Sequence, residues 1–180
     1  RDVKQTDLRN HIGYIPQKAV LFSGTIESNL RYAKLDATQD EIEKSIEIAQ
    51  ATNMVNEKPG RYAEPISQGG TNVSGGQKQR LSIARALVKN PDIYIYDDSF
   101  SALDYKTDSA LRAALEKDLS DKTLIVVAQR ISTIMGADQI IVLNEGQIVG
   151  KGRHDELMDN CEVYREIAFS QLSKEELNHE

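Results

Sequence analysis

Cysteine, tryptophan and long apolar runs are scarce or missing in this chain. Its 180 residues include one cysteine, Cys161, and no tryptophan. A single cysteine excludes a disulfide framework within the chain and is typical of a reducing compartment. No run of about 18 apolar residues occurs, so no segment is expected to span a membrane by itself. The polar start at Arg1, without Met, has no signal-peptide pattern and looks like part of a longer protein.

An excess of basic residues is also missing. Lys and Arg number 22 against 28 Asp and Glu, which gives a formal net charge of −6. Such an acidic balance argues against general binding to a phosphate backbone, so no nucleic-acid partner is expected. Hydrophobic residues make up 39% of the chain and charged residues 28%, a balance that excludes wholesale disorder.

The first half of the chain predicts one short strand followed by helices. The strand, residues 12–15, is closed by Pro16, and residues 21–89 have mostly helical patterns. Two capping-box patterns mark helix starts, Thr38 with Glu41 and Ser74 with Gln77. The basic residues along the second of these helices are interpreted as a solvated face: Lys78, Arg80, Arg85 and Lys89.

The second half changes to short apolar runs. Runs at 93–96 and 124–128 are separated by a helical stretch at 106–120, a pattern typical of parallel strands joined by a crossover. A third run, 139–143, is followed by a return strand near Ile148. A last helix is expected at 163–172, with an acidic tail after it at 174–180.

Glycines open the helix at Ser74. The segment Val73-Ser74-Gly75-Gly76-Gln77 combines residues that permit close backbone approach with the positive end of a helix dipole, an arrangement that suits a phosphate. Taken alone, the same turn is also an ordinary helix cap.

Acidic residues end the first apolar run of the second half. Ile93-Tyr94-Ile95-Tyr96-Asp97-Asp98 has the form of a Walker B element, in which the first carboxylate holds Mg²⁺ and the second polarises the attacking water. The alternative is a strand that ends at a polar turn.

Together with three further motifs, these segments resemble the nucleotide-binding domain of ABC transporters, of which the chain looks like the C-terminal two thirds. Gln17 is similar to the Q-loop glutamine, Val73–Gln77 to the LSGGQ signature and Ser101–Asp104 to the D-loop, while Gln129 stands at the H-loop position. Residues 21–26, Leu-Phe-Ser-Gly-Thr-Ile, resemble exporters.

This resemblance implies a fold and a domain division. The fold is α/β, a partial RecA-like P-loop core with a mainly parallel sheet and flanking helices, plus an inserted α-helical subdomain. Residues 1–20 would be the end of the first core segment with the Q-loop, and residues 21–89 the helical subdomain that ends in the signature helix. Residues 90–160 would be the second core segment, and residues 161–180 a C-terminal helix.

The resemblance also implies a composite ATP site shared by two subunits. The signature residues would bind the γ-phosphate of ATP held by a partner: Ser74, Gly75, Gly76 and Gln77. On the chain's own side, Gln17 and Asp97 would hold Mg²⁺, and Asp98 and Gln129 would be catalytic. Asp104 would lie at the dimer seam, and residues 17–29 would contact a coupling helix of the membrane domain.

Several positions depart from the family pattern. The Walker A loop, G-x-x-x-x-G-K-[ST], is absent from the printed sequence and is expected upstream of Arg1, so the chain alone should bind Mg·ATP weakly or not at all. Asp98 stands where the family has a catalytic glutamate, and Gln129 replaces the switch histidine. Gln68 stands where exporters usually carry glutamate.

Asp98 and Gln129 both depart from the family pattern, whereas the signature is nearly intact. This combination predicts a heterodimeric exporter in which this chain carries the degenerate ATP site. The chain would lie on the cytoplasmic face of a plasma membrane, and the exporter would be of bacterial multidrug type by analogy. Two alternatives stay open. One is an inert subunit that only caps its partner, and the other is a soluble ABC ATPase, which would be expected to carry a coiled-coil insertion or basic patches.

Overall fold

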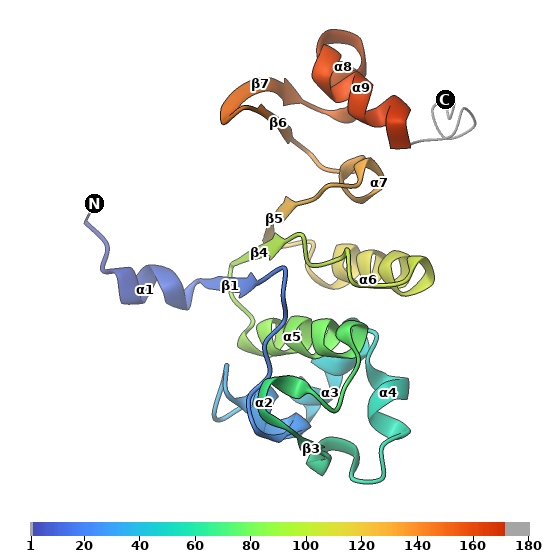
Figure 1. The fold of residues 1–180 in the computed structure, drawn as a ribbon. Coiled ribbons are helices and arrows are strands. Elements are labelled where there is room, and N and C mark those ends of the chain that lie inside the picture. Colours follow the sequence, from blue (N-terminus) through green and yellow to red (C-terminus); the bar gives the residue numbers. More distant parts are fainter. Residues whose placement is uncertain (1, 172–180) are drawn as a thin grey trace. The chain divides into compact units, whose positions relative to one another are not determined.

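A computed structural model describes residues 2–171 of the chain, and these residues form two compact units that divide between Val127 and Ala128 (Figure 1). The tail at 174–180 and Leu172, expected in the last helix, lie outside the described residues. Within the described part, none of the helices combines the length and the apolar character needed to cross a membrane.

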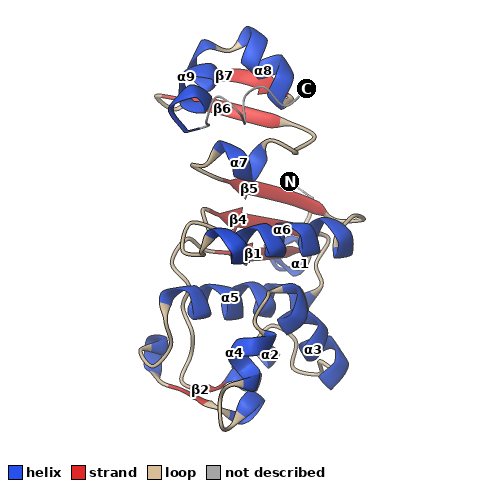
Figure 2. Cartoon of the chain, turned by 90° about the vertical axis from the view of Figure 1, so that its right-hand side faces the viewer, coloured by secondary structure: helices blue, strands red, loops and turns tan. Residues whose placement is uncertain are grey.

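The first unit is built on a parallel three-stranded sheet with the order β1-β4-β5 (Figure 2). Its strands are β1 (Ile12–Ile15), β4 (Ile93–Asp97) and β5 (Thr123–Val127), and helix α6 (Tyr105–Asp118) connects the last two. The predicted crossover and parallel pairing are therefore confirmed. Helix α1 (Gln5–Asn10) precedes the sheet.

A helical region lies between β1 and β4 in the chain. It contains α2 (Ile26–Arg31), α3 (Gln39–Ile48), α4 (Thr52–Asn56) and α5 (Gly75–Lys89), with a small antiparallel pair of strands, β2 (Gly24–Thr25) and β3 (Pro65–Ile66). Both predicted capping boxes form, at the starts of α3 and α5. Helix α5 packs against α2, α3 and β1 and so joins the helical region to the sheet (Figure 1).

The core of this unit follows from strand alternation. Tyr94 and Tyr96 point to one face of β4 and are fully buried, whereas Ile93, Ile95 and Asp97 point to the other face and are partly exposed. The buried face packs with apolar residues of the helices, including Leu81, Ile83 and Leu111.

The second unit has its own core. Strands β6 (Ile140–Asn144) and β7 (Gln147–Gly152) form an antiparallel hairpin, as the return strand near Ile148 predicts. Helices α7 (Ile131–Ile134), α8 (His154–Asn160) and α9 (Glu162–Gln171) complete it, and Tyr164 and Ala168 of α9 are buried among Ile140, Val142 and Leu157.

Candidate functional site

The two adjacent acids lie at the carboxyl end of the middle strand of the sheet. Asp97 is the last residue of β4, and its Oδ2 accepts a hydrogen bond from the Tyr14 hydroxyl at 2.7 Å. This bond raises the pKa of Tyr14, because ionising the phenol beside a carboxylate is unfavourable.

Asp98 follows in a left-handed backbone conformation with φ of 45°. Its N–H donates to the carbonyl of Val127 at 2.9 Å, and Ser101 Oγ donates to its carbonyl at 2.7 Å. A non-glycine residue held at positive φ costs about 1–3 kcal/mol and is found mainly where the surrounding structure needs a particular side-chain direction.

Gln17 reaches the second acid from the loop that follows the neighbouring strand, β1. Its Nε2 donates to Asp98 Oδ2 at 2.9 Å, although 81 positions separate the two residues. The parallel register Ile15↔Tyr96 brings the two strand ends to the same edge of the sheet. The buried Gln79 of α5 also donates to the Pro16 carbonyl at 3.2 Å, which fixes the loop that carries Gln17.

The oxygen donors at this edge fit Mg²⁺ chemically. Carboxylate and amide oxygens from Asp97, Asp98 and Gln17 are hard ligands, and Mg²⁺ is commonly held by one or two carboxylates together with phosphates and water. Among residues 2–171, no group of three or more His, Cys, Asp or Glu could hold a metal ion on its own.

The predicted signature forms the start of α5. Ser74 is the N-cap, its Oγ accepts from Gln77 N at 3.3 Å, and Gln77 Oε1 accepts from Ser74 N at 3.0 Å. This reciprocal pair holds the first turn of a 15-residue helix in place. The glycine-rich turn is thus a helix cap, as its simpler interpretation predicts.

The two glycines of this turn face little of the chain itself. A Cβ placed on Gly75 would meet no other atom within 4 Å, and one on Gly76 would lie 3.4 Å from the carbonyl oxygen of Ala102, an ordinary contact. Neither glycine has a positive φ. Packing within the described residues therefore does not explain why these two positions are glycine.

Asp104 is the N-cap of α6. Its Oδ1 accepts from Thr107 N at 2.9 Å and its Oδ2 from the Thr107 hydroxyl at 2.7 Å. These bonds, with the backbone N–H first, hold the pKa of Asp104 below its usual range. The side chain is thereby fixed next to Ala102 and Leu103, the residues that precede it in the predicted D-loop.

Gln129 belongs to the second unit, where it is exposed. Its carbonyl accepts from Gln171 Nε2 at 2.8 Å, and Gln171 Oε1 accepts from Ile131 N at 2.9 Å. Helix α9 therefore holds the backbone of the predicted switch loop. The sequence offered no signal for Gln171, because this contact joins residues about 40 positions apart.

The interpretation of the basic residues on α5 as a solvated face was wrong. All four are only partly exposed, and three reach backbone carbonyls of other segments. Arg80 donates to Gln50 O at 2.6 Å, Arg85 to Val20 O at 2.9 Å, and Lys89 to Arg9 O and Ile12 O at 2.6 Å. Burial lowers the pKa of Arg85 and of Lys89. Arg80, Arg85 and Lys89 therefore connect α5 to neighbouring segments, because backbone carbonyls of those segments lie within hydrogen-bond distance of the helix.

These features define a nucleotide-binding ATPase domain. They are a parallel sheet whose middle strand ends in two carboxylates, a glutamine beside them, and a capped, glycine-rich helix start. A family model described as "ABC transporter" matches residues 1–101, more than half of the chain. The chain belongs to the ABC transporter family.

The relatives of the chain include proteins named as ABC transporter ATP-binding proteins and as ATP-binding cassette proteins. The chain is 42% identical over 175 residues to "Uncharacterized ABC transporter ATP-binding protein YfiB" of Bacillus subtilis, covering 97% of this chain and 30% of that protein. It is 45% identical over 163 residues to human "ATP-binding cassette sub-family B member 5", covering 91% of this chain and 13% of the relative.

A solved structure of an ABC exporter has a similar fold. "Structure of a bacterial Atm1-family ABC exporter with ATP bound" matches with a TM-score of 0.91 and 35% identity, over 96% of this chain and 30% of that one. The predicted family, an exporter-type ABC nucleotide-binding domain, and the predicted fold class are confirmed. The chain spans about 30% or less of the length of these relatives.

Proposed function

We propose that this chain is the ATP-binding motor part of an ABC half-transporter, which couples ATP turnover in the full-length protein to export. The observation that carries the proposal is the open space in front of Gly75, at the start of a helix whose first turn is held by Ser74 and Gln77. A phosphate bound there would gain backbone donors and the positive end of the helix dipole.

The nucleotide at this helix start would be the one held by a second half-transporter subunit. Ser74, Gly75, Gly76 and Gln77 would bind its γ-phosphate, with Asp104 at the seam between subunits. The chain's own ATP, with Mg²⁺ at Asp97 and Gln17, would additionally need a Walker A loop, which the printed sequence does not contain. We therefore expect residues 2–171 alone to bind nucleotide weakly.

The chain's own site would turn over slowly. Asp98 is one methylene shorter than the glutamate of the family pattern, and a displacement of about 1 Å in a positioned group can slow a reaction on the order of 10²-fold. The Gln17 amide already holds the Asp98 carboxylate at 2.9 Å, which limits how far that carboxylate can move to compensate. Gln129 cannot become cationic as a histidine can. These features support a heterodimer with one fast and one slow site.

The test is ATP turnover by the full-length heterodimer. Asp98→Asn in this chain should leave turnover almost unchanged, whereas replacing the catalytic glutamate of the partner subunit should abolish it. A large loss from Asp98→Asn would contradict the asymmetric assignment. ATP occluded at this chain's site with no turnover at all would instead favour the inert capping subunit.

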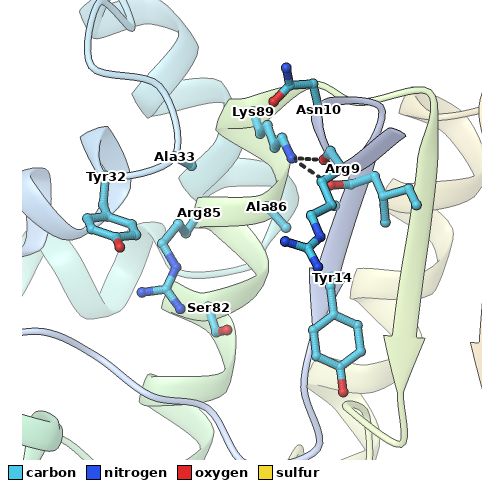
Figure 3. A pocket seen from close by; sticks show the side chains of 11 residues that line it. Arg9, Asn10, Tyr14, Tyr32, Ala33, Ser82, Arg85, Ala86 and Lys89 are labelled. Carbon is cyan, nitrogen blue, oxygen red and sulfur yellow. Dashed lines mark hydrogen bonds between the residues drawn. The ribbon is translucent and has the colours of Figure 1, made fainter. Parts of the chain in front are cut away.

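Membrane coupling would use the segment at 17–29. Arg85, which donates to Val20 O of this segment, also lines an open pocket. The pocket has a volume of about 510 Å³ and lies between α5, β1 and the end of α2 (Figure 3). Arg85 lies over the Phe22 ring at 5.3 Å, and Phe22 contacts Tyr32 with ring centroids 4.5 Å apart. Within the described residues, Arg85 Nη1 and Ser82 Oγ are buried without a hydrogen-bond partner. A coupling helix docked on residues 17–29 would place the domain on the cytoplasmic side.

A further inference from the structure

Tyr14 of β1 makes a hydrogen bond to a predicted Mg²⁺ ligand, Asp97. The register pairs Tyr14 with Ile95, and Asp97 stands two positions further along β4, so both side chains project from the same face of the sheet. The tyrosine hydroxyl donates to Asp97 Oδ2 at 2.7 Å. A hydroxyl–carboxylate bond of this length is charge-assisted and stronger than a neutral one.

We propose that Tyr14 is a positioning residue for the cation site: its hydroxyl fixes the Asp97 carboxylate so that the other oxygen, Oδ1, is presented to the Mg²⁺ of bound nucleotide. The proposal rests on the proposed function, in which Asp97 is a cation ligand. Outer partners of this kind orient the ligand, and their removal typically weakens metal affinity about 10–100-fold.

Tyr14 lies on the exposed face of β1 in the described chain. Its side chain is 56% exposed, while its neighbours Gly13 and Ile15, on the opposite face, are buried. The hydroxyl has its hydrogen-bond partner, Asp97, on the face of the sheet opposite to the buried Ile15. Tyr94 and Tyr96 on the adjacent strand show the contrast, since they are buried and supply core volume.

The hydrogen bond also has a parallel three residues later. Gln17 donates to Asp98 as Tyr14 donates to Asp97, so both acids are held from the same neighbouring segment. The two bonds fix two carboxylates whose mutual repulsion would otherwise spread them over several rotamers. Loss of the Tyr14 hydroxyl should release only the first of them.

The experiment compares Tyr14→Phe with the unchanged full-length heterodimer. Mn²⁺ is titrated in the presence of a non-hydrolysable ATP analogue and bound metal is followed by electron paramagnetic resonance. The variant should bind Mn²⁺ about 10-fold more weakly at this chain's site, with the unaltered partner site as an internal reference. Tyr62→Phe, at a partly buried tyrosine in the helical region, is the matched control and should bind Mn²⁺ normally.

Two further measurements separate the possible failures. The thermal midpoint without nucleotide should be unchanged in Tyr14→Phe, and a drop that accompanies the loss of affinity would make the role structural and overturn the proposal. Asp97→Asn should weaken Mn²⁺ binding strongly. If Asp97→Asn does so and Tyr14→Phe does not, positioning is refuted and the proposed cation site stands; if neither does, the cation assignment itself fails.

Discussion

Replacing Gly75 by alanine should stabilise the fold and damage the function. Gly75 is the first residue of α5, has no left-handed φ, and a Cβ there would meet nothing within 4 Å. Alanine can therefore adopt the native conformation and restricts the unfolded chain more than glycine does. The same methyl group would occupy the space through which a phosphate approaches the backbone of the helix start.

The two effects have different sizes. Compatible glycine-to-alanine changes stabilise by roughly 0.4–1 kcal/mol, which in a domain of this size raises the thermal midpoint by about 1–4 °C. Displacing the γ-phosphate of the partner's ATP by about 1 Å should lower turnover on the order of 10²-fold. Opposite signs are expected because the fold gains from the methyl group and only the ligand is obstructed by it.

The assay pairs thermal unfolding without nucleotide with ATP turnover by the full-length heterodimer. Gly136→Ala is the matched control, because a Cβ at Gly136 also meets nothing within 4 Å and Gly136 also lacks a positive φ. The control should raise or keep the midpoint and leave turnover unchanged. If Gly75→Ala stabilises the protein and turns over ATP normally, the space in front of Gly75 is not a nucleotide site.

Three further predictions concern buried tyrosines. Burial raises the pKa of Tyr94 from 10.0 to about 12. The stability that the neutral phenol contributes should therefore be complete below pH 10 and disappear as the pH rises towards 12. Ultraviolet absorbance of tyrosinate, followed together with circular dichroism, would check this, and Tyr94→Phe should make the loss of stability at alkaline pH shallower. The Tyr96 hydroxyl is buried without a partner in the described chain, so Tyr96→Phe should raise the free energy of unfolding by about 1 kcal/mol. Tyr164→Phe should lower it by about 1 kcal/mol, because that hydroxyl lies 2.8 Å from His154 Nδ1; equal denaturant midpoints for both variants would contradict the reasoning.

Most of the fold could be predicted from the sequence because its determinants are local. The capping boxes at Thr38 and Ser74 involve residues three positions apart, and both form. Short apolar runs separated by one helix leave few arrangements other than a parallel pair with a crossover, which is what β4, α6 and β5 form.

The sequence predicted which residues belong to the candidate site, but not how their side chains contact one another. The motifs named Gln17, Asp97 and Asp98, but the hydrogen bonds of these acids cross more than 80 positions of the chain and depend on the strand register. Tyr14 was missed for that reason, although its place two residues before Pro16 on the exposed face of β1 would have pointed to it once the register was known. The catalytic and binding roles of these residues stay predictions.

The sequence by itself determined the family, the order of the elements and the chemical character of the predicted site, since these follow from residue types at short spacing. Only the tertiary structure decided which neighbours each group has. It directed Arg80, Arg85 and Lys89 of α5 to backbone carbonyls. Within the described residues, it also left Arg85 Nη1 and Ser82 Oγ buried without partners and Gly75 facing open space. The physical reason is that burial and hydrogen bonding between distant segments depend on how whole elements pack, which no local pattern specifies.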